Sequence, residues 1–193
     1  MMAKLYFRHG TVGSAKTLNL LAVAHNYIQQ GKKIKVGVPK IDTRFGEGVI
    51  KSRAGLERKA DFIVGKDCLN YEYFAASCCI LLDEAQFLSK EEVSWFRDLT
   101  RELNIPVICY GLRTDFRTLA FEGSLRLFEL ADSIEEIKTV CTYCSGKAIF
   151  NLKHSNGIPT ITGPSIDLGI EDKYLPACYE CYSNLIPSIK DKL

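Results

Sequence analysis

The sequence has no apolar segment approaching the ~20 consecutive residues that a membrane-spanning helix requires. It also has no internal repeat, no low-complexity tract and only three histidines, to which we assign no role. A formal net charge of +2 provides no basic stripe for nucleic acid and no footprint for an anionic membrane. The first residues lack the apolar core of a secretory signal. We therefore expect a cytoplasmic protein with neither a membrane nor a nucleic-acid partner.

The composition is that of an ordinary globular protein, with 47% hydrophobic and 25% charged residues. A chain of 193 residues is long enough for one full-sized domain and a small appendage. Its eight cysteines suggest disulfides, but Cys68, Cys78, Cys79 and Cys109 stand alone or within apolar runs. That placement is typical of small buried side chains. Only the other four cysteines have the spacing of metal ligands.

Strand-like and helix-like segments alternate along the first two thirds of the chain. Strands are expected over residues 5–7, 33–38, 78–82, 107–112 and 134–140, and helices over 16–30, 91–103 and 123–131. This alternation predicts an α/β fold with a parallel sheet covered by helices on both faces. The polar segment 41–59 is expected to be a long, mobile surface loop. A hairpin is expected around residues 155–157.

Residues 10–17 approximate the phosphate-loop pattern G-x-x-x-x-G-K-S/T, between an expected strand and an expected helix. In such a loop the backbone amides cradle polyphosphate, Lys16 reaches the phosphates and the Thr17 hydroxyl binds Mg²⁺. The pattern assigns nucleotide binding to Gly10, Thr11, Val12, Gly13, Ser14, Ala15, Lys16 and Thr17. Ala15 stands where the pattern has glycine, and its Cβ disfavours a positive φ. The alternative is a helix start that binds no ligand.

Two acids, Asp83 and Glu84, follow the apolar run that ends at Leu82. In an open α/β sheet the carboxyl ends of the strands form the edge at which ligands bind. Asp83 suits a water-mediated contact to Mg²⁺, and Glu84 suits a base that takes a proton from a hydroxyl or water. The alternative is a solvated pair that caps the next helix, because Ser89 and further acids follow.

Cys141 and Cys144 form one C-x-x-C pair, Cys178 and Cys181 form a second, and 33 residues lie between the two pairs. Four thiolates make a closed tetrahedral site, which indicates structural Zn²⁺ rather than catalytic Zn²⁺. A redox pair is the alternative. The cysteine-containing region has few apolar residues, and a small domain of this kind needs such a cross-link. We expect a nucleotide-binding domain over residues 1–139 and a zinc-ribbon domain over residues 140–193.

With these motifs assembled, the sequence resembles the type II thymidine kinase family of zinc-containing P-loop deoxynucleoside kinases. The resemblance covers nearly the whole chain and is carried by residues 5–7, 10–17, 41–44, 83–87, 110–116 and 121–124 and by both C-x-x-C pairs. It implies a RecA-like P-loop sheet with a zinc-ribbon and lasso-loop domain. It also implies a homotetramer that phosphorylates the 5′-hydroxyl of thymidine, and of deoxyuridine, with ATP and Mg²⁺. Thymidine triphosphate is the implied feedback ligand.

The resemblance also implies roles for individual residues. Glu84 is the general base, Asp83 and Thr17 serve the magnesium of ATP, and Arg44 and Gln86 lie beside the nucleotide. The implied thymine pocket consists of Val12, Phe87, Leu112, Phe116 and Phe121, closed by a lasso that includes Ser165, Ile166, Asp167, Leu168, Gly169 and Tyr174.

Two features depart from the family pattern, namely Ala15 in the phosphate loop and a short segment over residues 65–77. Two other classes of function stay open. One is a nucleic-acid-dependent ATPase with a zinc ribbon, because an Asp-Glu pair after a buried strand also occurs in helicase-like sheets. The other is a nucleoside-binding relative whose catalysis is weakened by Ala15.

Overall fold

The computed structural model describes residues 2–67, 70–165 and 174–186. A six-stranded sheet with the strand order β5-β2-β6-β7-β1-β8 forms the centre of the larger part of the chain. Its strands are β1 (Leu5–His9), β2 (Ile34–Pro39), β5 (Phe62–Val64), β6 (Cys79–Leu82), β7 (Val107–Gly111) and β8 (Ser133–Glu136). All five neighbouring pairs are parallel, which confirms the predicted α/β class. Strand β5 was not predicted.

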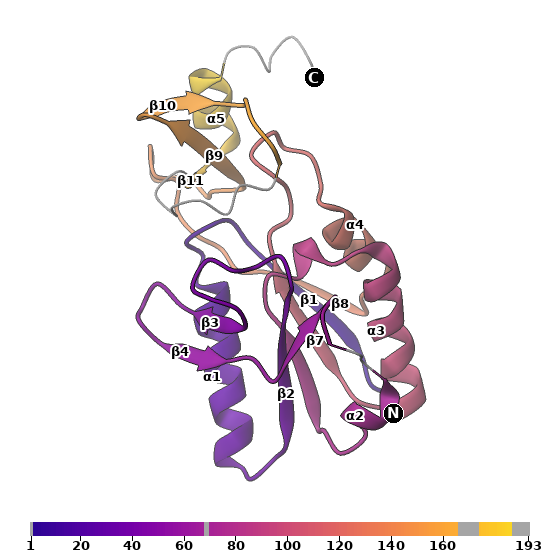
Figure 1. Ribbon diagram of the computed structural model, residues 1–193. Coiled ribbons are helices and arrows are strands. Elements are labelled where there is room, and N and C mark those ends of the chain that lie inside the picture. The colour runs from indigo at the N-terminus through magenta and orange to yellow at the C-terminus, as the bar shows by residue number, and fades with distance from the viewer. Residues whose placement is uncertain (1, 68–69, 166–173, 187–193) are drawn as a thin grey trace.

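Helices cover both faces of this sheet (Figure 1). Helix α1 (Lys16–Gln29) lies on one face, and α3 (Lys90–Leu103) and α4 (Glu122–Leu130) lie on the other. Strand β6 shows why its sequence is continuously apolar. Ile80 and Leu82 pack on the α3 side, whereas Cys79 and Leu81 pack on the α1 side, so alternate side chains bury on opposite faces.

The register of the strands aligns their carboxyl ends. His9 at the end of β1 lies beside Gly111 at the end of β7, and Leu82 at the end of β6 pairs with Cys109. The segments that follow these parallel strands therefore leave the sheet at one edge. This edge receives the phosphate loop, the Asp83-Glu84 pair and the segment that begins at Leu112.

Helix α3 begins with a complete capping box. The Glu92 amide donates to Ser89 Oγ at 3.1 Å, and the Ser89 amide donates to the Glu92 carboxylate at 2.9 Å. The 3-10 helix η1 (Ala85–Phe87) separates this cap from the acidic pair. The capping alternative for Asp83 and Glu84 is therefore excluded, because Ser89 and Glu92 cap the helix.

The prediction of a long, mobile loop over residues 41–59 was wrong. Strands β3 (Val49–Lys51) and β4 (Glu57–Lys59) form an antiparallel hairpin there. Ile50 is 2% exposed and packs into the cluster under α1. Ser52 Oγ and the Leu56 backbone exchange two hydrogen bonds of 3.1 Å across the turn. One buried aliphatic side chain thus anchors a segment that is otherwise polar.

The isolated cysteines and the short segment 65–77 were predicted in part. Cys79 and Cys109 are buried, but Cys78 is exposed, so its predicted burial was wrong. Cys78 precedes β6 and its side chain has no face of the sheet to bury against. Cys68 lies outside the described residues.

Helix α2 (Tyr71–Phe74) is short, as the segment length suggested, and Phe74 anchors it in the core on the α3 side.

A second, smaller part of the structure begins at Cys141. We call this part the C-terminal region (residues 141–165 and 174–186). Its three-stranded antiparallel sheet consists of β9 (Phe150–Ser155), β10 (Ile158–Thr160) and β11 (Tyr174–Ala177), followed by α5 (Tyr179–Leu185). Asn156 and Gly157 both have positive φ angles (51° and 78°) in the β9–β10 turn, and the predicted hairpin is confirmed. Strand β11 and helix α5 were not predicted. In Figure 1 the region lies beyond the ligand-binding edge of the large sheet.

No helix in the described ranges is both long enough and apolar enough to cross a membrane.

Candidate active site

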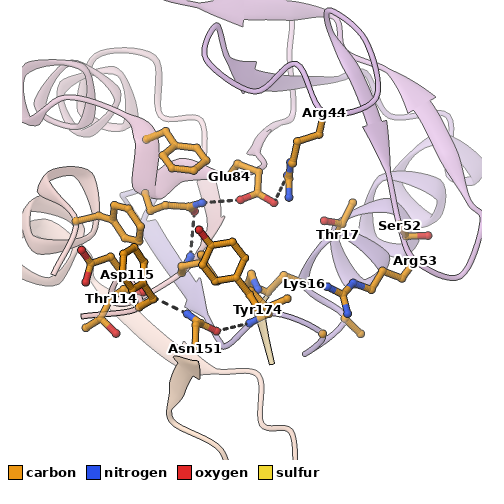
Figure 2. A pocket seen from close by; sticks show the side chains of 18 of the residues that line it. Lys16, Thr17, Arg44, Ser52, Arg53, Glu84, Thr114, Asp115, Asn151 and Tyr174 are labelled. Atoms are coloured by element: carbon orange, nitrogen blue, oxygen red, sulfur yellow. Dashed lines mark hydrogen bonds and ion pairs between the residues drawn. The ribbon is translucent and has the colours of Figure 1, made fainter. Parts of the chain in front are cut away.

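A cavity of about 410 Å³ lies at the carboxyl edge of the large sheet (Figure 2). Most of the predicted site residues line it, namely Val12, Gly13, Ala15, Lys16, Thr17, Arg44, Glu84, Gln86, Phe87, Leu112, Phe116, Phe121, Ser165 and Tyr174. Gly10, Thr11, Ser14 and Asp83 are not among the lining residues. The predicted lasso residues Ile166, Asp167, Leu168 and Gly169 lie outside the described residues.

The phosphate loop joins β1 to α1 through two left-handed residues. Gly13 has φ 77°, and Ala15, the residue that caps α1, has φ 63° and ψ 27°. The Lys16 ammonium donates to the Thr11 carbonyl at 2.7 Å. Burial lowers the pKa of Lys16 to about 8, against the opposing influence of Glu84 and Asp83. The loop therefore holds a buried lysine at the floor of the cavity, as a phosphate loop requires.

Asp83 lies directly after β6 and is 4% exposed. Its carboxylate accepts a hydrogen bond from Thr17, while its Oδ1 atom has no hydrogen-bond partner. Burial and the neighbouring Glu84 raise the pKa of Asp83 to about 7. A buried carboxylate oxygen without a partner, next to a threonine hydroxyl, fits a hard divalent cation such as Mg²⁺.

Glu84 is held in a left-handed conformation with φ 49° and ψ 37°, which is uncommon for a residue with a side chain. One carboxylate oxygen accepts from Arg44 Nη2 at 2.5 Å and the other from Gln86 Nε2 at 2.5 Å. Burial alone would raise the pKa of Glu84, but Arg44 and Lys16 outweigh burial and hold this pKa below its usual value. Glu84 is therefore a carboxylate at neutral pH, and both its oxygens are fixed.

The residues around Glu84 are themselves fixed. Gln86 Oε1 accepts from the Leu112 amide at 3.0 Å, which ties η1 to the end of β7. A Cβ at Gly111 would lie 2.8 Å from Gln86 Oε1, so this close approach requires glycine. Arg44 also donates to Asp42, at 2.8 Å and 3.2 Å, and its pKa is raised because Glu84 and Asp42 outweigh burial.

The opposite side of the cavity is aromatic. The rings of Phe87 and Phe121 meet edge to face, with centroids 5.7 Å apart. The rings of Phe116 and Tyr174 lie 6.2 Å apart; Phe116 lies in the segment after β7, and Tyr174 lies in the C-terminal region. An apolar space bounded by ring faces and edges suits a planar heterocycle. The cavity thus combines a phosphate-loop side with an aromatic side, and Glu84 lines the same space.

The four paired cysteines come together at one point. Their Sγ atoms all lie within 4.8 Å of one another, and none forms a disulfide. The amides of Tyr143, Gly146 and Cys181 donate to cysteine sulfurs at 3.3–3.4 Å. Backbone hydrogen bonds outweigh burial and lower the pKa of Cys141 to about 6, whereas the hydrogen bond with Cys178 raises the pKa of Cys181. Four converging sulfurs with amide donors fit a structural Zn²⁺.

Comparison with known proteins agrees with this geometry. A family model described as thymidine kinase matches residues 3–182. The chain belongs to the thymidine kinase family.

The thymidine kinase of Streptococcus pyogenes serotype M28 is 43% identical to this chain over 187 residues, covering 95% of this chain and 98% of that protein. The thymidine kinase of Streptococcus gordonii is 44% identical over 184 residues, covering 94% and 96%. Among solved structures, the Pif1 helicase from Candida albicans gives a TM-score of 0.40 at 11% identity, covering 70% of this chain and 36% of that chain. The helicase likeness is too weak to bear on function. The family predicted from the motifs is confirmed.

Sequence reasoning missed several residues of the site in this family member. Those that also line the cavity are Leu18, Lys51, Ser52, Arg53, Ala54, Thr114, Asp115 and Asn151. The β3–β4 hairpin contributes four of them, one at the end of β3 and three in the turn. The arginines of this segment were the feature of the sequence that could have indicated a role in phosphate binding. Only the folded hairpin, however, brings Arg53 next to the phosphate loop. Nothing near Asn151 in the sequence indicates a role.

We expect about one zinc ion per chain, because four converging thiolates form a complete coordination shell. Cys178→Ser should lose the metal and lower the melting temperature, since structural zinc contributes to folding free energy. Metal analysis together with thermal unfolding measures both effects. Cys78→Ser is the matched control and should keep its zinc. Full zinc content in Cys178→Ser, or disulfides in place of metal in the parent protein, would contradict the assignment.

We expect Ala15→Gly to stabilise the protein by about 1 kcal/mol, because glycine adopts a positive φ without steric cost. The freed loop should also bind ATP several-fold more tightly or turn over several-fold faster, with thymidine affinity little changed. Denaturant unfolding and nucleotide titration measure these effects. Ala22→Gly, at an exposed site within α1, should instead destabilise the protein by about 1 kcal/mol. Equal stability and ATP binding in Ala15→Gly and the parent would show that the loop tolerates alanine.

Proposed function

We propose that this protein transfers the γ-phosphoryl group of ATP to the 5′-hydroxyl of thymidine, and that it also accepts deoxyuridine. The proposal rests on one observation above all. The cavity that contains the phosphate-loop lysine also contains an aromatic pocket, and the ionised Glu84 lines the same space. Membership of the thymidine kinase family makes the protein a phosphotransferase and implies ATP and thymidine as its substrates.

In the proposed reaction Glu84 accepts the proton of the 5′-hydroxyl as the hydroxyl oxygen attacks the γ-phosphorus. The bond between the γ-phosphorus and the bridging oxygen breaks, and ADP leaves with the electron pair. Gln86 and Arg44 hold the carboxylate of Glu84 in place throughout. Catalysis of this kind comes from positioning and electrostatics rather than from a covalent intermediate.

Lys16 and Arg44 both line the cavity. We propose that their positive charges stabilise the negative charge on the transferred phosphoryl group. Asp83 and Thr17 would hold Mg²⁺, which neutralises negative charge on the phosphate oxygens. The unpartnered Oδ1 atom of Asp83 supports this assignment, because a bound cation would give it a partner. The backbone amides of the phosphate loop supply the remaining contacts to the phosphates.

The thymine base is proposed to lie between the Phe87–Phe121 pair and the Phe116–Tyr174 pair, beside Leu112. Ser165 and Tyr174 belong to the predicted lasso and line the cavity, and Ile166 to Gly169 are proposed to complete it over the base. A closed lasso would exclude water and so prevent transfer of the phosphoryl group to solvent. The polar edge of the base would then bond to backbone groups of this loop.

Several broader features belong to the same proposal. The chain would divide into a nucleotide-binding domain over residues 1–139 and a zinc and lasso domain over residues 140–193, a division supported by the separate core of the C-terminal region. We also propose cytoplasmic location, assembly into a homotetramer and feedback by thymidine triphosphate.

The two alternative functions are less well supported. A nucleic-acid-dependent ATPase is disfavoured by a net charge of only +2, and stimulation of ATP hydrolysis by single-stranded DNA would favour it. A weakened nucleoside-binding relative is favoured only by the strained φ of Ala15. That strain costs of order 1–3 kcal/mol of conformational free energy, and it removes no catalytic group.

A panel of nucleosides incubated with ATP and Mg²⁺ tests the proposal. We expect thymidine and deoxyuridine to yield the monophosphate and purine nucleosides to yield none. Glu84→Gln should lower turnover by roughly 10²-fold or more, because it removes the general base, while ATP binding and folding persist.

Glu91→Gln, an exposed change on α3, is the matched control and should leave turnover unaltered. Absence of any monophosphate with the parent protein would contradict the proposed function. Near-normal turnover in Glu84→Gln would instead remove only Glu84 from the mechanism.

We further propose that Arg53 contacts the phosphates of ATP. Its Nη1 atom lies 3.6 Å from the position a Cβ would take at Gly13, and its charge helps to lower the pKa of Lys16. Arg53→Ala should weaken ATP binding about tenfold, the usual scale for a charge-assisted hydrogen bond, with thymidine affinity unchanged. Titration with each ligand measures the two affinities. Lys59→Ala, on the same hairpin, is the control, and an equal loss in both variants would contradict a specific contact.

A further inference from the structure

Asn151, in β9 of the C-terminal region, links three segments with one side chain (Figure 2). It is 4% exposed. Its Oδ1 atom accepts from the Val12 amide of the phosphate loop at 2.8 Å. Its Nδ2 atom donates to the Thr114 carbonyl, in the segment after β7, at 3.3 Å. A single buried amide therefore connects the phosphate loop, the segment that carries Phe116 and the C-terminal sheet.

Two other hydrogen bonds join the C-terminal region to the segment after β7. The Tyr182 hydroxyl of α5 donates to the Phe116 carbonyl. Arg113 Nη2 donates to the Ile149 carbonyl at 3.1 Å. Neither bond includes a residue of the phosphate loop, whereas the bond from Asn151 to Val12 does.

We propose that Asn151 is a positioning residue, which sets the phosphate loop relative to the nucleoside pocket. This inference rests on the proposed kinase function. The two bonds require one acceptor and one donor on the same planar group, and a carboxamide supplies both. Because the site is buried, removal of Asn151 leaves the Val12 amide and the Thr114 carbonyl without partners, which is costly.

The position of Val12 explains why this bond bears on the nucleotide. Val12 precedes Gly13 and Ala15, whose left-handed conformations set the turn that leads into Lys16. An unrestrained Val12 amide would let the first half of the loop move while the second half stays fixed by α1. Phosphate contacts depend on the direction of the loop amides, so nucleotide affinity should fall while the aromatic pocket is retained.

The test compares Asn151→Leu, which keeps the volume without the polar atoms, with Tyr182→Phe, which removes only the hydroxyl on the nucleoside side. ADP and thymidine binding are measured separately by calorimetry, with zinc content and melting temperature. We expect Asn151→Leu to weaken ADP binding about tenfold, or about 1.4 kcal/mol, with thymidine affinity within about threefold of the parent. Tyr182→Phe should affect thymidine more than ADP.

Hydrogen exchange at the Val12 amide gives a readout that does not depend on kinase function. Exchange should accelerate in Asn151→Leu and stay slow in Tyr182→Phe. Asn151→Ala provides the same comparison if the leucine variant does not fold. Unchanged ADP affinity or unchanged Val12 protection in a folded, zinc-loaded variant would overturn the inference, as would equal losses for both ligands in both variants. If the parent protein bound neither ligand, the proposed function would fail, and Val12 exchange would still decide the role of Asn151.

Discussion

Parallel pairing of β1 with β7 and of β7 with β6 is the constraint on which the site depends. It aligns the carboxyl ends of these strands, so three segments distant in sequence leave the sheet at one edge. The phosphate loop, the Asp83-Glu84 pair and the segment from Leu112 each contribute one part of the cavity. The helices on both faces, and the cores beneath them, hold this edge in place.

Burial and neighbouring charges shift the pKa values of the ionisable side chains at that edge in different directions. The pKa of Lys16 is lowered by burial and the pKa of Asp83 is raised by burial and by Glu84, whereas Arg44 and Lys16 keep Glu84 ionised. Two adjacent acids thus acquire different protonation behaviour from their surroundings. This separation of roles is what a site needs when one acid serves a cation and the other accepts a proton.

The C-terminal region does more than bring the four paired cysteines together. Its buried core comprises six residues, Cys141, Ala148, Leu152, Ala177, Tyr182 and Ile186, and two of the four cysteine sulfurs adjoin this core as partly buried neighbours. The C-terminal region, although its core is small, contributes Asn151 and Tyr174 to the cavity. A zinc cross-link at the four cysteines would therefore be connected, through β9 and β11, to the side chains that this region contributes to the cavity.

The sequence alone determined the fold class, the phosphate loop, the acidic pair, the aromatic pocket residues and the four cysteines. The aromatic pocket residues followed from the resemblance to a known family, whereas the other features depend on local spacing or on an apolar pattern that the fold must bury. Tertiary structure decided which distant segments come into contact, because local sequence patterns do not encode such contacts. Burial of Ile50 turns a polar segment into a hairpin and places Arg53 beside Gly13. Asn151 meets Val12 across 139 residues, a contact that exists only because the C-terminal sheet packs against the ligand-binding edge.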